Sequence, residues 1–230
     1  MILVQKFLNH DETAAIVRGI VNAGFRSVVT PFQPEPALLS GESLDAALQT
    51  AISAAVERGI RSHPDPFQPN RVECIAGPDF LRFLDGMSLG YSPVRALHNA
   101  QTPTGKMRCD SLLHVCLSDP AGYTGGDMQI NSSDRPGQRL QLAAGDAVLL
   151  GWDDIFALRV VHKGPLYHLI LRFQYDELFS AMEAERPLST VSMSQDPEIA
   201  VIGKNLLQRV SLIQRSRKAP LAPPTSGEII

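Results

Sequence analysis

Two of the six histidines in this chain lie in predicted strands, where an imidazole can bind a metal ion or exchange a proton. His114 lies with Cys116 in the apolar run 111–117, and His168 lies in the run 167–171. Because side chains alternate across a strand, His114 and Cys116 share one face. Neutral imidazoles bind Zn, Cu, Fe or Ni, and an imidazole with a pKa near neutrality serves as a general acid or base. These residues are therefore the first candidates for a functional site.

Short strands joined by turns are the elements that must position these side chains. Strand-like runs cover residues 111–117, 145–150 and 167–171. The segments Asp119-Pro120-Ala121-Gly122 and Thr124-Gly125-Gly126 are typical of turns, since glycine allows positive φ and proline fixes its own φ. Closely spaced strands without a long helix between them predict an antiparallel sandwich or barrel.

Composition and charge exclude several classes of protein. A chain of 230 residues that is 44% hydrophobic can bury one core as a single domain. A net charge of −3 provides no basic surface for nucleic acid or an anionic membrane. No apolar run reaches membrane-spanning length, and residues 1–11 become polar too early for a secretory signal. Three cysteines do not make a disulfide framework, so we expect a protein of the reducing cytoplasm.

Helical patterns flank the predicted strands. One helix is predicted over 11–24 and a second over 43–58, each capped by its first residue, with Gly59 ending the second. The segment 63–66, His-Pro-Asp-Pro, predicts a rigid loop. We predict one domain over 1–214, followed by a flexible tail, 215–230. The domain comprises an N-terminal helical part (1–68), a β core (69–175) and C-terminal helices (176–214).

The central strands and turns resemble a known family. Leu117-Ser118-Asp119-Pro120 is followed by Tyr123-x-Gly125-Gly126-Asp127, and then by Leu142-x-x-Gly145-Asp146-x-Val148-Leu149. In order and spacing this series resembles the PKHD-type hydroxylases, which are Fe(II)/2-oxoglutarate oxygenases of the prolyl-4-hydroxylase-like group. The resemblance implies a mainly β fold with flanking helices around a double-stranded β-helix core (jelly roll, cupin-like). It also implies a small molecule bound inside that core.

The resemblance locates the family's metal site, and this chain departs from the pattern at all four positions. The family's His-x-Asp-Asn-Ala corresponds to Ala96-Leu97-His98-Asn99-Ala100, so the first histidine and the carboxylate are replaced. The distal histidine falls on Phe156, or on Leu158 in an alternative alignment, and the arginine that binds the co-substrate falls on Leu166. Non-haem iron of this kind requires two histidines and a carboxylate. The family's catalytic residues therefore cannot be carried over, and we do not expect 2-oxoglutarate as a cofactor.

The same alignment suggests a substitute site. It places His114 and Cys116 on an inward face, and it places Leu166 inward, so that His168 and Arg172 share the face of Leu166. His98 stands at a former ligand position. We therefore predict His98, His114 and His168 as catalytic or metal-binding residues, and Cys116, Arg172 and Asp153 as substrate-binding residues.

Several interpretations of the three histidines remain open. They can form an all-histidine site for Fe, Cu or Zn, or a metal-free acid–base site. Either would make the chain a divergent oxygenase-like enzyme that tailors a small molecule in a biosynthetic pathway. Alternatively they line an inactive oxygenase fold that serves as a binding or partner subunit, with a protein partner or a second copy of the chain. An arrangement like that of oxygenase-fold halogenases, with Ala100 in place of the carboxylate, would need His162 as its distal ligand.

Overall fold

The structure is a computed structural model that describes residues 1–26, 36–94, 100–102, 105–132, 137–152 and 154–176. The chain divides into two compact units, Met1–Pro187 and Leu188–Ile230, and the second lies wholly outside the described residues. The sequence predicts C-terminal helices over 176–214 and a tail over 215–230. Apart from residue 176, both lie outside the described ranges. That part of the domain division stays a prediction.

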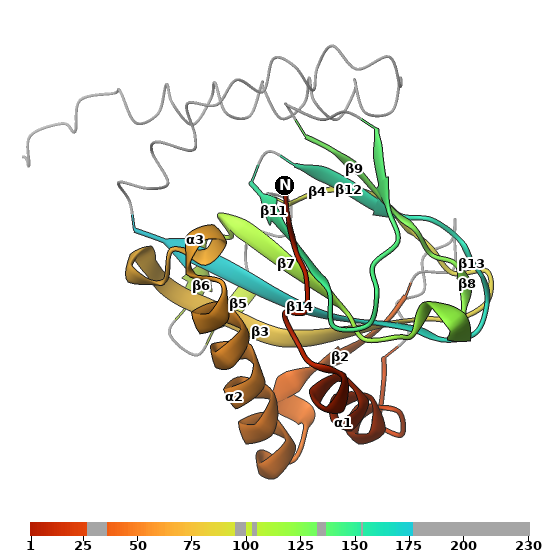
Figure 1. Cartoon of the computed structure of the whole chain (residues 1–230). Helices are drawn as coiled ribbons and strands as arrows, with labels where there is room; N and C mark the ends of the chain where they lie inside the picture. The colour runs from red at the N-terminus through yellow and green to blue at the C-terminus, as the bar shows by residue number, and fades with distance from the viewer. Residues whose placement is uncertain (27–35, 95–99, 103–104, 133–136, 153, 177–230) are drawn as a thin grey trace, which may run out of the picture. The chain divides into compact units, whose positions relative to one another are not determined.

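Two antiparallel sheets form most of the described fold (Figure 1). The larger has the order β1-β11-β7-β14-β3-β2 and the smaller the order β10-β9-β12-β4. The strands of the larger sheet are β1 (Ile2–Val4), β2 (Ala37–Ser40), β3 (Val72–Phe83), β7 (Ser111–Cys116), β11 (Ala147–Gly151) and β14 (Leu166–Tyr175). Those of the smaller sheet are β4 (Leu89–Pro93), β9 (Met128–Asn131), β10 (Gln138–Leu140) and β12 (Ile155–Leu158). Two short pairs complete the strands: β5 (Ala100–Thr102) with β6 (Gly105–Met107), and β8 (Thr124–Gly125) with β13 (Val161–Lys163).

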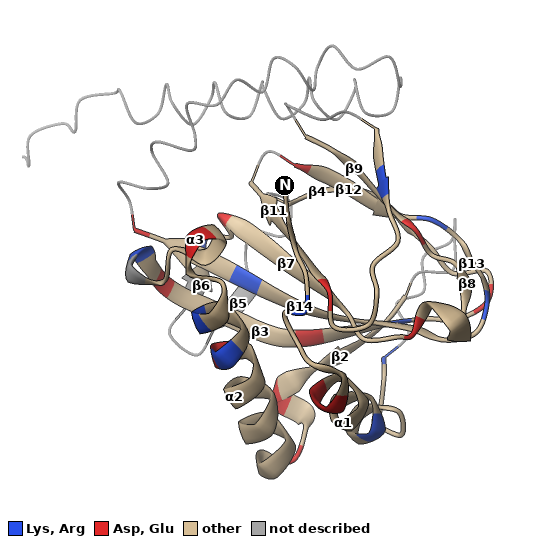
Figure 2. Ribbon diagram, viewed as in Figure 1, with Lys and Arg blue, Asp and Glu red and all other residues tan. Residues whose placement is uncertain are grey.

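The helices cover the face of the larger sheet that points away from the smaller sheet (Figure 1). They are α1 (His10–Ile20), α2 (Ala46–Ser62) and α3 (Pro64–Phe67), with short 3-10 turns η1 (Gly41–Ser43), η2 (Pro69–Arg71) and η4 (Pro120–Gly122). Figure 2 shows charged residues mainly on the helices and turns, with few along the strands. Within the described residues, no helix combines the length and apolarity needed to span a membrane.

Strand β7 shows why the larger sheet has two buried faces. Leu113 and Val115 pack against the helices, in a cluster that includes Ile16 of α1 and Ile52 of α2. The alternate residues of β7 face the smaller sheet instead, and every residue of β7 is buried. Burial on both faces explains why this strand reads as a continuous apolar run in the sequence. The second cluster, between the two sheets, is called the inner cluster below.

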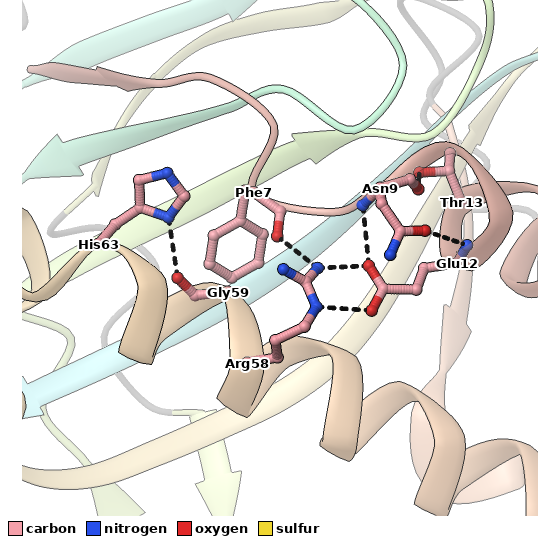
Figure 3. Close-up of polar contacts among 7 residues, drawn as sticks. All are labelled: Phe7, Asn9, Glu12, Thr13, Arg58, Gly59 and His63. Atoms are coloured by element: carbon pink, nitrogen blue, oxygen red, sulfur yellow. Dashed lines mark hydrogen bonds and ion pairs between the residues drawn. The ribbon is translucent and has the colours of Figure 1, made fainter.

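The two long helices begin and end at other residues than the sequence predicts, because other local caps are used at their N-termini and Gly59 packs inside α2. Asn9, not Asp11, caps α1 through a capping box with Glu12, whose carboxylate also pairs with Arg58 of α2 (Figure 3). Asp45, not Ser43, caps α2, and α2 continues through Gly59 to Ser62. A Cβ at Gly59 would lie 2.7 Å from the ring of Phe7, so this glycine permits close packing of α2 rather than ending it.

The residues that carry the family resemblance form turns and attach distant segments to one another. Asp119 accepts a hydrogen bond from the amide of Ala121 and so caps η4. Gly145 has φ +86°, and a Cβ there would lie 2.2 Å from the carbonyl oxygen of Leu8. Asp146 accepts a hydrogen bond of 2.8 Å from the amide of Lys6. Gly145 and Asp146 therefore hold the N-terminal segment against the start of β11.

Candidate functional site

The inner cluster is mostly apolar, and a few polar side chains lie on the same strand faces. Its large apolar members come from both sheets: Leu81, Phe83, Leu112, Met128, Ile130, Val148, Leu150, Phe156, Leu158, Leu166 and Ile170. His114, His168, Cys116, Arg172 and Asp79 lie on the faces of β7, β14 and β3 that look toward this cluster. Polar groups in such surroundings need hydrogen-bond or charge partners.

The rings of His114 and His168 are neighbours inside the barrel. His114 on β7 is paired with Ile170 of β14, and His168 is paired with Cys116, so the two histidines stand one diagonal step apart. Their ring centroids are 5.8 Å apart, with an angle of 72° between the planes. His114 is fully buried and His168 is 3% exposed. The placement of these two side chains toward one interior agrees with the strand alternation seen in the sequence.

Three ring nitrogens of this pair have no hydrogen-bond partner within the described residues. They are Nδ1 and Nε2 of His114 and Nδ1 of His168, and all three are buried. A buried polar atom without a partner destabilises a fold by about 1–3 kcal/mol. The pair therefore offers hydrogen-bonding capacity that no described residue satisfies and that an ion, a water molecule or a ligand can take up.

Burial keeps both imidazoles neutral. It lowers the pKa of His168 to about 4, and it lowers the pKa of His114 well below the usual value, with further lowering by repulsion from a protonated His168 and from the charge of Arg172. A neutral imidazole has one N–H donor and one acceptor nitrogen, and it is the form that binds metal ions. The acid–base interpretation assumed a pKa near neutrality, and neither histidine has one in the metal-free chain.

Aromatic rings surround the histidine pair. The ring of Phe156 lies 4.8 Å from that of His114, and the ring of Phe83 lies 6.0 Å from that of His168, both in edge-to-face arrangements. Phe156 and Leu166 are buried and offer no atom that binds a metal or a carboxylate. Within the described ranges, no three His, Cys, Asp or Glu side chains are arranged to hold a metal ion. The described residues therefore do not fit an iron and 2-oxoglutarate site of the kind the resemblance implies.

Arg172 lies on the inner face of β14, further along the strand than the histidines. Its Nη1 is 2.6 Å from Oδ2 of Asp79, across the β14–β3 ladder. Sequence reasoning did not select Asp79; the signal for it was a carboxylate directly before the apolar residues Phe80 and Leu81 of β3. Arg172 and Asp79 therefore form an ion pair on the same inner surface as His114.

The remaining predicted site residues divide into three groups. His98 and Asp153 lie outside the described residues, so their roles stay predictions. Cys116 is buried with its Sγ 3.4 Å from the carbonyl oxygen of Ser118, and burial raises its pKa to about 11, which keeps the thiol protonated. His162 is exposed on β13, away from the inner cluster, which leaves a halogenase-like arrangement without its distal ligand.

Two other charged groups have structural contacts. Arg108 makes a two-point contact with Asp110, at 2.7 and 3.0 Å. Asp154 is buried, accepts a 2.7 Å hydrogen bond from the amide of Gly151 and lies 3.1 Å from the amino group of Met1. Asp154 therefore stabilises the turn between β11 and β12.

Comparison with known proteins identifies the relatives of this chain. No protein-family model matches it. A PKHD-type hydroxylase of Klebsiella pneumoniae is 30% identical over 162 residues, covering 68% of this chain and 70% of the relative. The PKHD-type hydroxylase YbiX of Escherichia coli is 27% identical over 164 residues, covering 70% and 68%. A prolyl-4-hydroxylase of Pseudomonas putida aligns in structure with a TM-score of 0.57 at 13% identity, over 76% of this chain and 92% of its own, which confirms the double-stranded β-helix core. This chain belongs to the PKHD-type hydroxylase family.

Proposed function

We propose that this chain is a divergent oxygenase-like protein that acts on a small molecule between its two sheets, at His114 and His168. The observation that carries the proposal is the set of three buried ring nitrogens without partners. Natural cores seldom leave such atoms unpaired unless a ligand, ion or water completes them. A functional site explains the destabilisation that these two residues cause, whereas a purely structural core would favour apolar side chains at both positions.

A ligand with one polar group suits this pair. The imidazoles together offer two N–H donors and two acceptor nitrogens, within an apolar and aromatic surrounding formed by residues such as Phe83 and Phe156. Hydrogen bonds are strengthened in such a low-dielectric environment. The rest of the ligand would contact apolar side chains, which is the usual composition of a small-molecule site.

We also propose that His98 is the third ligand of an all-histidine metal site with His114 and His168. Three imidazoles with one open position suit Zn, Cu or Fe, and a metal bound there would supply Lewis-acid or redox chemistry. The proposal does not include 2-oxoglutarate, because Leu166 provides no cation for the far carboxylate of that molecule. The chain's own residues would hold the ion and exclude water from it.

Metal analysis of the purified protein, before and after reloading with Zn, Cu or Fe, tests the histidine site. We expect close to one equivalent of metal, lost in the variants His98→Ala, His114→Phe and His168→Phe. His63→Ala is the matched control, because His63 contacts the carbonyl oxygen of Gly59 at the end of α2, far in sequence from the site. Metal that remains bound in all three site variants would contradict the metal proposal.

The alternative is an inactive oxygenase fold that only binds its ligand, and the buried Phe156 and Leu166 support it. Small-molecule binding that depends on His114 and His168, without metal and without any change in the molecule, would favour this alternative. Turnover that requires metal would favour the enzyme. Unchanged ligand binding in both the His114 and the His168 variants would contradict the enzyme proposal and the binding-only alternative alike.

A further inference from the structure

Arg172 and Asp79 place a positive and a negative charge side by side at one end of the inner surface. Their side chains are 16% and 18% exposed, whereas His114 is fully buried. The Nη1–Oδ2 contact is the one hydrogen bond that the structure gives Arg172 within the described residues. A guanidinium has five N–H groups and a carboxylate has two oxygens, so most of the hydrogen-bonding capacity of both groups remains.

The polar residues of the inner surface follow one direction along the strands. On β14, His168, Ile170 and Arg172 share a face, and His114 of β7 stands opposite Ile170. Adjacent positions on one face are roughly 7 Å apart along a strand. The ion pair therefore stands about one such step from His114, and exposure to solvent decreases from Arg172 toward the histidines.

The wall beside this series is apolar. On β3, Leu81 and Phe83 follow Asp79 on the same face, and Phe83 contacts His168. A ligand that follows this wall would meet two opposite charges at the exposed end, with His114 level with Asp79 on the other side of Ile170, and then Leu81, His168 and Phe83 toward the buried end. A lone anion would be repelled by Asp79 and a lone cation by Arg172, whereas a group that carries both charges is attracted by both.

We infer that the ligand is a zwitterion of the α-amino-acid type, whose carboxylate binds Arg172 and whose ammonium group binds Asp79. This inference rests on the proposed function, since it identifies the class of small molecule for the same site. The side chain of the amino acid passes His114, which stands level with Asp79, and lies along Leu81 toward His168 and Phe83. Arg172 presents a planar fork that matches a carboxylate, which a lysine would not.

Thermal shift and calorimetric titration with matched compounds test the inference. The panel is L-phenylalanine, L-leucine and L-tyrosine, each compared with its amide, which lacks the carboxylate, and with its N-acetyl derivative, which lacks the ammonium group. We expect at least one free amino acid to bind, and each single modification to weaken binding by roughly tenfold or more. Equal binding of an amino acid and its amide, or no binding by any free amino acid, would overturn the inference.

Variants connect that binding to the ion pair. Arg172→Met and Asp79→Asn should each weaken binding roughly tenfold, and Arg172→Lys, which keeps the charge and the fold, should fall between Arg172→Met and the unchanged protein. Arg58→Met is the control, because it breaks a cross-element ion pair outside the inner surface, with Glu12, and should lower Tm without changing the dissociation constant. Binding that is unchanged in Arg172→Lys and Asp79→Asn would overturn the inference.

The histidine variants separate this inference from the proposed function. Amino-acid binding that depends on Arg172 and Asp79 but not on His114 or His168 would support the zwitterion site and contradict the proposed function. Binding of uncharged or purely anionic molecules that depends on the histidines alone would support the proposed function and contradict the zwitterion site.

Discussion

The turns of this barrel match the motifs of the PKHD-type hydroxylases, whereas the interior departs from them at the family's site positions. Asp119, Gly125, Gly145 and Asp146, which belong to the matching motifs, cap η4, permit close backbone approach or attach the N-terminal segment. The inner surface instead holds a histidine pair beside Phe156, three of whose ring nitrogens have no partner among the described residues. Residues that build the scaffold and residues that perform chemistry can therefore change independently within one fold.

The largest effect should come from the turns. Gly145→Val places a branched side chain at φ +86° with its Cβ 2.2 Å from the carbonyl oxygen of Leu8, so we expect destabilisation by about 4 kcal/mol or more. Chemical denaturation measures this change. Gly122→Ala is the matched control, because nothing lies within 4 Å of its Cβ and its φ is not positive. A similar loss in both variants would show that Gly145 has no special role.

The interior should make the metal-free protein sensitive to acid. The pKa of His168 falls from its usual value near 6.5 to about 4 on folding, so the unfolded chain takes up a proton that the folded chain does not. The contribution of His168 to the free energy of unfolding is therefore fully present above pH 6.5. It is lost as the pH falls to 4, which lowers the free energy of unfolding by about 3 kcal/mol.

Denaturation curves across that pH range, with chelator present, test this expectation. His168→Phe should remove this part of the pH dependence, while Glu12 and the other carboxylates still contribute theirs. Equal pH dependence in the variant and the unchanged protein would mean that His168 is not held neutral by burial.

A smaller effect, of opposite sign, should follow from removing the unpaired imidazole. His114→Leu replaces two buried nitrogens without partners by apolar atoms, so the metal-free protein should keep its stability or gain about 1 kcal/mol. Ligand or metal binding should be lost in the same variant. The comparison is Leu112→Ala on the same face, which should destabilise by about 3 kcal/mol because it leaves a cavity. A large loss of stability in His114→Leu would instead assign His114 a structural role.

The smallest change concerns one turn. Asp119→Ala removes the cap of η4 and should destabilise by about 1 kcal/mol, with ligand binding unaffected. Asp119→Asn keeps an oxygen acceptor and should recover most of the loss. An effect on ligand binding larger than that on stability would connect this turn to the site.

The sequence predicted the alternation of β7 and β14 correctly, because a period of two assigns each residue to a face without knowledge of the partner. The family resemblance identified which faces point inward, and the alternation then placed His114 and His168 in one interior. Sequence reasoning failed where long-range contacts decide: Gly59 was expected to end α2, but α2 continues to Ser62 and Gly59 packs on Phe7. Asp79 was overlooked because its significance depends on Arg172, 93 residues further along the chain.

We propose that this chain kept the family's barrel but not its iron and 2-oxoglutarate site. Titration of the metal-loaded protein with 2-oxoglutarate tests this proposal most directly. We supply Fe(II) without oxygen, measure the heat of binding and Tm, and then admit oxygen and assay succinate. The account predicts no saturable binding, no shift in Tm and no succinate. Saturable binding with succinate release, abolished by a single substitution in the barrel, would contradict it.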